Sequence, residues 1–399
     1  MSQHTLPPLQ RDWLRQLSPD ERAHSERLLA LIVAEIERAG GWLDFQSFMN
    51  LALYAPGLGY YSAGTHKLGH GGDFTTAPEI SPLFSRCVAR QCAQVLQTLG
   101  AGSVLELGAG SGVMALEMLR ELQRQDCLPE RYCILEVSAD LRARQQALLQ
   151  QHLPDYLPRV HWLDALPQDF VGVIVANEVL DALPVQRFSV QQGELQAMGV
   201  INTGNGLDWQ ARPADRALST ALQAIRDNVK VIWPEGYCSE VNLQLPGWIH
   251  ALANSLQQGV LLFIDYGLPQ HQYYAGERSR GTLSCFFRQR MHEDPLINVG
   301  LQDITAWVDF TAVAEAGIAA GLELRGFATQ AHFLFGAGLQ HLLADMSEQD
   351  DALRWKLSQQ VQKLTLPGEM GESFKAMALA KNYDEPLSGF GFRDLRDHL

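Results

Sequence analysis

The stretch SVLELGAGSG (Ser103–Gly112) decides the fold of this 399-residue chain. Its apolar run Ser103–Leu107 predicts a short buried strand, and Val113–Leu122 after it predicts a helix. Glycines between a strand and a helix let the backbone turn sharply and let a ligand approach without an intervening Cβ atom. The free N–H groups at the start of the helix then favour an anionic group. The stretch therefore predicts a ligand site, with a glycine-rich turn that binds nothing as the alternative.

Strands and helices alternate on the carboxyl-terminal side of this stretch. Further strands are predicted at Tyr132–Val137, Val160–Leu163, Val171–Ala176 and Val260–Asp265, with helices at about Ala139–Gln151 and Phe310–Ala320. This alternation is typical of an α/β protein in which helices cover both faces of a parallel sheet. Ligands in such sheets bind at the carboxyl ends of the strands, where the glycine loop lies. We expect Leu322–Phe327 and His332–Phe335 to close the sheet as a hairpin.

The chain divides into a head, a core and a tail, which we expect to form one domain with additions. The head contains a predicted helix at Phe45–Tyr54 and a loop whose large aromatic side chains either pack down or contact a ligand. The tail has the pattern of amphipathic helices. The expected boundaries are 1–100 for the N-terminal helices and glycine-rich loop, 101–335 for the core with insertions at about 185–258 and 266–309, and 336–399 for a helical C-terminal extension.

The chain carries 45 acidic and 31 basic side chains, a formal net charge of −14. Proteins that bind nucleic acid use basic patches, so this charge argues against nucleic acid and fits a cationic ligand or a basic protein better. No apolar run approaches the roughly 18–20 residues that span a bilayer, so we expect no membrane insertion. The start MSQHTLPPLQRDW lacks the features of a secretion signal, and the six cysteines form no C-x-x-C pair. We therefore expect reduced thiols in a cytoplasmic protein.

The glycine loop has the spacing G-x-G-x-G at residues 108–112, with Glu106 two residues before its first glycine. Dinucleotide-binding loops have the longer spacing G-x-G-x-x-G. The shorter spacing resembles the S-adenosylmethionine loop of class I methyltransferases. This resemblance implies that Glu136, at the end of the second strand, holds a ribose and that Asp164, after the third strand, lies near an adenine. NAD is the alternative cofactor, and no metal is expected, because His66 and His70 have a suitable spacing but no evident third ligand.

The fourth strand ends in NEVLDALP (Asn177–Pro184). Glu178 and Asp181 are three residues apart, so a helical turn would place both carboxylates on one face. Beside the reactive end of the cofactor, this pair could hold a guanidinium in a forked hydrogen-bonded pair and accept a proton. The alternative is a helix start with Asn177 as its N-cap. The chain lacks both the Asn/Asp-Pro-Pro-aromatic motif of adenine amino methyltransferases and the Pro-Cys nucleophile of cytosine-carbon methyltransferases, which also argues against nucleic acid.

Several strings resemble the MidA-like class I methyltransferases, whose mitochondrial member is a protein-arginine methyltransferase that assists assembly of respiratory complex I. The strings are GYYS (59–62), GDFTTAPEISPLF (72–84), ELGAGSG (106–112), LEVS (135–138), NEVLDALPVQRF (177–188), DYG (265–267), LQDITAWVDF (301–310) and PGEMGESFKAMAL (367–379). They cover the chain nearly from end to end. The resemblance implies a class I methyltransferase fold, with a Rossmann-like, mostly parallel sheet, and S-adenosyl-L-methionine as cofactor.

The resemblance also implies a set of site residues. Glu178 and Asp181 would face the acceptor, and Glu79 would lie near the cofactor or substrate in a loop that covers the site. The expected cofactor-binding residues are Glu106, Gly108, Ala109, Gly110, Gly112, Glu136, Asp164, Ala165 and Asn177. We therefore expect a methyltransferase that acts on an arginine of a protein substrate. The alternatives are an assembly chaperone that binds the cofactor without transferring a methyl group and a small-molecule methyltransferase; a homodimer is left open.

Overall fold

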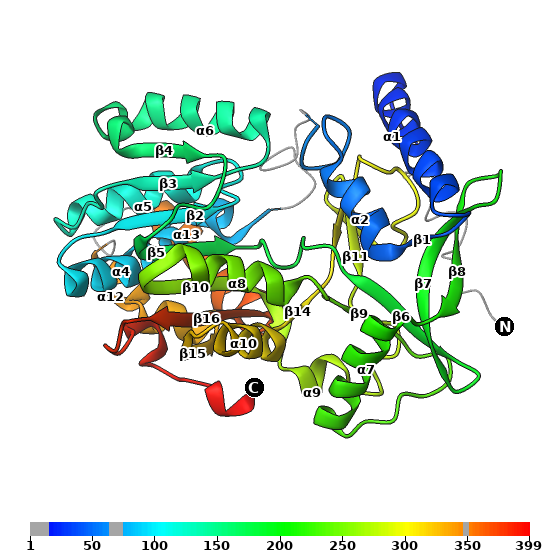
Figure 1. Ribbon diagram of the computed structural model, residues 1–399. Coiled ribbons are helices and arrows are strands. Elements are labelled where there is room, and N and C mark those ends of the chain that lie inside the picture. The colour runs from blue at the N-terminus through cyan, green and yellow to red at the C-terminus, as the bar shows by residue number, and fades with distance from the viewer. Residues whose placement is uncertain (1–15, 64–74, 346–350) are drawn as a thin grey trace.

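The computed structural model describes residues 16–63, 75–345 and 351–399, and Figure 1 shows two lobes. The larger lobe contains a sheet with the strand order β15–β16–β10–β5–β2–β3–β4, in which β14 also pairs with β10. Strands β4, β3, β2, β5 and β10 are parallel, and β16 is antiparallel between β10 and β15. The bounds are β2 Ser103–Leu107, β3 Tyr132–Leu135, β4 Val160–Leu163, β5 Phe170–Asn177, β10 Leu256–Leu268, β14 Val308–Asp309, β15 Glu323–Thr329 and β16 Phe374–Lys381. The predicted α/β fold with a mostly parallel sheet is confirmed.

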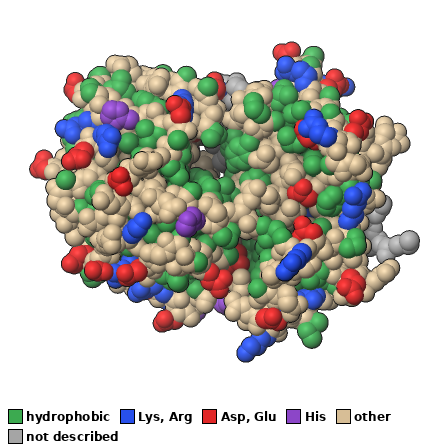
Figure 2. Space-filling model, in the orientation of Figure 1, with side chains coloured by type: hydrophobic (Ala, Val, Ile, Leu, Met, Phe, Trp, Pro, Cys, Tyr) green, Lys and Arg blue, Asp and Glu red, His purple; other side chains and the backbone are tan. Residues whose placement is uncertain are grey.

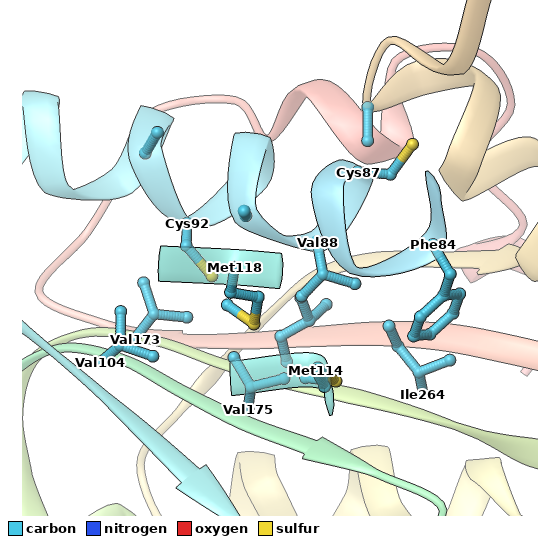
Figure 3. Packing of buried hydrophobic residues seen from close by; sticks show 14 of the residues in the cluster. Phe84, Cys87, Val88, Cys92, Val104, Met114, Met118, Val173, Val175 and Ile264 are labelled. Carbon is cyan, nitrogen blue, oxygen red and sulfur yellow. The ribbon is translucent and has the colours of Figure 1, made fainter. Parts of the chain in front are cut away.

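Helices cover both faces of this sheet, which is why its strands have continuous apolar sequences. Val104 and Leu105, neighbours on β2, belong to different hydrophobic clusters on opposite faces. In Figure 3, Val88 and Cys92 of α4 lie over Met118 of α5 and the strands beneath. Helices α8 and α10 cover the other face. The bounds are α3 Ala77–Ile80, α4 Pro82–Leu99, α5 Val113–Arg124, α6 Ala139–His152, a 3-10 helix Pro154–Arg159, α8 Leu245–Ser255 and α10 Phe310–Ala319.

The smaller lobe combines the first part of the head, up to residue 63, with parts of both insertions. Its sheets have the strand orders β1–β7–β6–β9, with β8 beside β7, and β12–β11–β13. Leu43 of β1 lies opposite Val200 of β7, which joins the head to the first insertion. Helices α1 and α2 share one hydrophobic cluster with both sheets. The bounds are α1 Pro19–Arg38, β1 Leu43–Asp44, α2 Phe45–Tyr54, β6 Gln186–Gln191, β7 Glu194–Asn202, β8 Leu207–Pro213, α7 Arg216–Val229, β9 Cys238–Val241, α9 Gln270–Tyr273, β11 Ser284–Phe287, β12 Arg290–His292 and β13 Asp303–Thr305.

The end of the larger sheet differs from the prediction. The expected hairpin strand His332–Phe335 lies in helix α11 (Gln330–Gly336), whose N-cap Thr329 accepts a hydrogen bond from the His332 N–H. Strand β16 takes the place of that strand beside β15, so the tail is not wholly helical. Its sequence FKAMALAK is rich in helix-forming residues, but pairing and burial between two strands outweigh that propensity. The other helices of the tail are α12 Leu339–Asp345, α13 Asp351–Thr365, α14 Met370–Ser373 and the 3-10 helices Ser388–Phe390 and Arg396–His398.

Two further properties concern the chain as a whole. All six cysteines are free thiols, and each of them is buried or partly buried. Among the described residues, no helix has both the length and the apolar sequence that crossing a membrane requires. His66 and His70, the pair considered for a metal, lie outside the described residues.

Candidate active site

A cavity of about 320 Å³ lies at the carboxyl ends of β2, β3 and β5. Figure 2 shows a hollow between the two lobes on the viewed face, with hydrophobic side chains around it. The larger lobe supplies the glycine loop and the ends of the strands, and the smaller lobe supplies Tyr54 and Tyr61. Of the described residues that line the cavity, none is a lysine, an arginine or a histidine, whereas four are glutamates. The cavity therefore has an acidic character.

The glycine loop forms one wall of the cavity. Gly108 and Gly110 have φ angles of +62° and +53° and line the cavity together with Ala109. Gly112 has a φ angle of +84° but is the N-cap of α5, where an added Cβ would lie 3.3 Å from the Cα of Gln145. Left-handed backbone conformations favour glycine at all three positions. Gly108 and Gly110 therefore leave room for a ligand, whereas Gly112 allows α5 and α6 to approach each other.

Glu136 lines the cavity at the end of β3 and is held by a network of hydrogen bonds. One carboxylate oxygen accepts the Ser138 N–H at 2.9 Å, and the other accepts the Gln145 side-chain amide at 3.2 Å. The same amide donates to the Gly110 carbonyl at 2.9 Å, and the Trp162 indole N–H donates to the Gln145 side-chain oxygen at 2.9 Å. Burial raises the pKa of Glu136, and these hydrogen bonds oppose that rise. Gln145 thus links the carboxylate to the glycine loop, a function that the sequence analysis missed.

Asp164, the residue expected near the adenine, lies at the surface. Its side chain is 92% exposed and pairs with the Arg142 guanidinium at 2.7 Å. Arg142 also donates to the Glu136 carbonyl at 2.6 Å and to the Leu163 carbonyl, so it draws Asp164 toward the outer surface of the strand ends. Neither Asp164 nor Ala165 lines the cavity, and the apolar Leu166 does.

Glu106 lies near the carboxyl end of β2, just before the glycine loop, and lines the cavity. It is buried, and the Tyr132 hydroxyl donates to its carboxylate at 2.6 Å. Burial raises the pKa of Glu106 to about 7, which the hydrogen bond from Tyr132 only partly opposes. The Glu106 carboxyl therefore ionises less readily than an exposed glutamate does.

Glu178 lines the cavity at the end of β5 in a strained backbone conformation, with a φ angle of +53°. Its N–H donates to the Ile264 carbonyl at 2.9 Å, and its carboxylate accepts the Ala77 N–H at 3.3 Å and the Asn177 amide at 3.1 Å. Burial raises the pKa of Glu178 to about 8, and the charge of Asp181 adds to the rise. Residues 178–183 form a turn, so both the predicted helical turn and the alternative with Asn177 as N-cap are wrong.

Asp181 is buried behind this turn and is not among the residues that line the cavity. Because Glu178 has a positive φ angle, the chain does not form the helical turn that would have placed the carboxylates of Glu178 and Asp181 on one face. Burial raises the pKa of Asp181 to about 6. The turn is held by Asp265, one of whose carboxylate oxygens accepts the N–H groups of Val179, Leu180 and Asp181 at 3.2, 2.9 and 3.2 Å. Asp265 thus positions the turn that carries Glu178.

Glu79 also lines the cavity, on the short helix α3. The Ser111 hydroxyl donates to its carboxylate at 2.5 Å, which ties the segment before α4 to the glycine loop. The structure therefore brings Glu79, Glu106, Glu136, Asn177 and Glu178 together around one cavity.

Aromatic side chains complete the walls. Of the aromatic residues in the loop after α2, Tyr60 is packed down and Tyr61 lines the cavity. Trp248, on α8, packs on Phe263 and also lines the cavity. Tyr54, at the end of α2, carried no signal in the sequence, because its position is decided by the packing of the two lobes.

The polar groups of the cavity fit a ligand that carries hydrogen-bond donors. The side-chain oxygen of Asn177 is buried and has no hydrogen-bond partner among the described residues. A buried acceptor without a donor is costly, so a ligand with amino or hydroxyl groups would stabilise it. Gly108 and Gly110 leave space for such a ligand, and the Glu136 carboxylate accepts hydrogen bonds of the kind that hydroxyl groups donate.

Comparison with known proteins identifies this ligand. The family model described as "Putative S-adenosyl-L-methionine-dependent methyltransferase" matches residues 87–328. A crystal structure from Burkholderia thailandensis, bound to S-adenosyl-homocysteine, is 41% identical and has a TM-score of 0.92. The match covers 96% of this chain and 99% of that chain. A second crystal structure from the same organism is also 41% identical, with a TM-score of 0.89 and the same coverage.

Curated relatives are more distant but also match over most of their length. The Drosophila melanogaster protein named "Protein arginine methyltransferase NDUFAF7 homolog, mitochondrial" is 28% identical over 88% of this chain and 85% of its own length. The Homo sapiens protein arginine methyltransferase NDUFAF7 is 27% identical over 86% of this chain and 81% of its own length. Both are named as mitochondrial proteins. These names contradict the cytoplasmic location expected from the sequence, and that expectation is withdrawn.

Proposed function

Because the chain belongs to this family of S-adenosyl-L-methionine-dependent methyltransferases, we propose that it methylates an arginine side chain of a protein. The methyltransferase class, the Rossmann-like fold and the cofactor S-adenosyl-L-methionine follow from the family and from the structural relative bound to S-adenosyl-homocysteine. The proposal goes further in naming an arginine side chain as the methyl acceptor. It is supported by the names of the curated relatives, which are protein arginine methyltransferases, and by the chemistry of the cavity.

The observation that carries the proposal is the carboxylate of Glu178 in a cavity whose described lining contains no basic side chain. A half-buried carboxylate without a positive partner is unfavourable, and the raised pKa of Glu178, about 8, reflects this cost. A guanidinium would remove the cost, because its planar fork donates two parallel hydrogen bonds to a carboxylate. Arginine keeps its charge at every physiological pH and therefore fits this site.

The side chains around the cavity then have two tasks. Bound S-adenosyl-L-methionine supplies a methyl group on a positively charged sulfur. Gly108, Gly110 and Glu136 are proposed to hold this cofactor, with Asn177 as an acceptor for one of its donor groups. Glu178 is proposed to bind the acceptor guanidinium, to orient one nitrogen toward the methyl group and to accept the proton that this nitrogen loses.

The test compares Glu178→Gln with Glu117→Gln. Glutamine keeps the acceptor oxygen for the Ala77 and Asn177 donors, and Glu117 lies on α5 in an ion pair with Arg120 outside the cavity. Each protein is incubated with a cell lysate and methyl-labelled S-adenosyl-L-methionine, and labelled residues are identified by mass spectrometry. We expect labelled arginine with the wild type and Glu117→Gln, and a loss of about 100-fold or more with Glu178→Gln.

Calorimetry with S-adenosyl-homocysteine provides the control, and we expect all three proteins to bind it equally within about threefold. Label on lysine or on a small molecule, with none on arginine, would contradict the proposed acceptor. Binding of S-adenosyl-homocysteine without transfer to any acceptor would favour the assembly chaperone.

A further inference from the structure

Two tyrosines of the smaller lobe, Tyr54 and Tyr61, line the cavity together with Glu178. Their rings stack on each other with centroids 5.6 Å apart and an interplanar angle of 24°. The Tyr54 hydroxyl donates to the Ala182 carbonyl at 3.0 Å, on the same turn as Glu178. The Tyr61 hydroxyl donates to a carboxylate oxygen of Asp303 at 2.9 Å. Both rings are therefore held in place at the side of the cavity where β5 ends.

These hydrogen bonds also decide what the tyrosines offer to a ligand. Both hydroxyl protons are used within the protein, so the ligand meets aromatic rings and oxygen lone pairs rather than donors. Rings and lone pairs attract a cation, and the acidic Glu178 lies in the same lining. Phenylalanine rings could form a hydrophobic wall, but they would not offer the oxygen lone pairs that the two tyrosines keep free for a cation.

We infer that the Tyr54–Tyr61 pair is the aromatic wall of the acceptor site and selects a planar guanidinium over an ammonium group. This inference rests on the proposed function, because it needs a cationic acceptor at Glu178. A guanidinium is planar and weakly hydrated, so it stacks on an aromatic ring while its edge donates to a carboxylate. An ammonium group is compact and strongly hydrated and cannot do both at once. The acceptor site is then complete only when both lobes are present.

The test uses small probes and the full-length protein saturated with S-adenosyl-homocysteine. The probes are ethylguanidinium, butylammonium and the neutral, planar N-ethylurea, and their affinities are measured by ligand-observed NMR. We expect ethylguanidinium to bind at least tenfold more tightly than either of the others. Saturation of tyrosine ring protons should transfer to bound ethylguanidinium, and the transfer should be lost when the tyrosines are ring-deuterated. This measurement needs no variant.

Variants test the wall directly. We expect Tyr54→Leu and Tyr61→Leu each to weaken ethylguanidinium binding about tenfold, and Tyr54→Phe to stay within about threefold because it keeps the ring. The affinity for S-adenosyl-homocysteine should not change in any of them, which also shows that each variant is folded.

Three results would overturn the inference, and they separate it from the proposed function. If the leucine variants bind ethylguanidinium as the wild type does while Glu178→Gln does not, the wall is wrong and the cationic acceptor site stands. If the leucine variants lose affinity for S-adenosyl-homocysteine instead, the tyrosines belong to the cofactor site. If the wild type binds ethylguanidinium no better than N-ethylurea, both the inference and the proposed arginine acceptor fail.

Discussion

Glu178 combines two unfavourable features in one residue. Its backbone has a φ angle of +53°, which costs of the order of 1 kcal/mol for a residue with a Cβ atom. Its half-buried carboxyl lies near the acids Asp181 and Asp265, and its pKa of about 8 is well above the ordinary value of 4.5. Features that destabilise a fold and persist at one position are typical of functional sites.

The ionisation of Glu178 predicts a pH dependence of methyl transfer. With the acceptor below saturation, the rate constant kcat/KM reports the free enzyme, in which Glu178 is protonated below a pH of about 8. Only the ionised form can hold a guanidinium. We therefore expect kcat/KM for the acceptor to rise by up to about tenfold per unit between pH 6 and 7.5 and to level off above pH 8.5. A flat profile over this range would contradict the assigned function of Glu178.

The stability of the protein provides the control for this prediction, because ionisation of Glu178 should raise activity but lower the free energy of unfolding. The folded pKa of Glu178 is raised, so the folded state binds its proton more tightly than the unfolded state, and stability falls as the pH rises from 4.5 to about 8. Glu178→Gln lacks this ionisation. We expect equal free energies of unfolding for the two proteins at pH 5 and a variant more stable by about 1 kcal/mol or more at pH 8.5.

The sequence predicts part of the site, and the reasons for success and failure differ from residue to residue. The glycine loop and Glu136 are placed by local patterns, because a strand end determines where the next residues point. Asp164 follows the same rule but turns outward, since Arg142 on α6 competes for its carboxylate. Tyr54, Gln145 and Trp248 carry no local signal, because their contacts depend on how distant elements pack.

At the scale of elements, the strands with continuous apolar sequences were predictable and those with mixed sequences were not. Strand β2 is buried along its whole length, and β10 is buried from Gly259 to Asp265. Strand β16 has an alanine- and lysine-containing sequence whose propensity is helical, and its structure depends on pairing with β10 and β15. Strand β16 lies about 50 residues from β15 and about 110 residues from β10 in the sequence, and pairing over such separations produces no periodic pattern of apolar residues in either segment.

Two glycines where three strands approach each other provide a test at this scale. An added Cβ at Gly172 of β5 would lie 1.9 Å from the Ser103 carbonyl oxygen of β2, and one at Gly259 of β10 would lie 1.8 Å from the Gly172 carbonyl oxygen. The strands would have to move apart in the middle of the sheet. We expect Gly172→Ala to lower the free energy of unfolding by more than about 3 kcal/mol, measured by chemical denaturation.

Gly206 is the matched control for this substitution. Its φ angle of +134° nearly equals the +137° of Gly172, but nothing lies within 4 Å of a Cβ built on it. Gly206→Ala therefore carries only the conformational cost, which we expect to be about 1–2 kcal/mol. Equal losses of unfolding free energy in the two variants would show that position 172 needs glycine for its backbone conformation and not for the close approach of the strands.

At the scale of the whole molecule, each lobe is assembled from segments that lie far apart in the sequence. The larger lobe takes its last strand, β16, from residues 374–381, and the smaller lobe combines the first part of the head with parts of both insertions. The cavity receives side chains from both lobes. Because the acid at the end of β5 and the tyrosines of the head meet only in the complete molecule, the boundaries drawn along the sequence do not coincide with independent functional units.

The position of β16 leads to a prediction about truncation. We propose that residues 367–399 belong to the core of the larger lobe, because β16 pairs with β10 on one side and with β15 on the other and is buried along most of its length. A chain that ends at Leu366 would leave β15 without a partner and would expose the edge of β10 that lies opposite β5. We expect this chain to be insoluble or unable to bind S-adenosyl-homocysteine, as measured by solubility and calorimetry, and co-expression with a separate 367–399 segment to restore both. A soluble 1–366 chain that binds S-adenosyl-homocysteine as the full chain does would show that the tail is an appended extension.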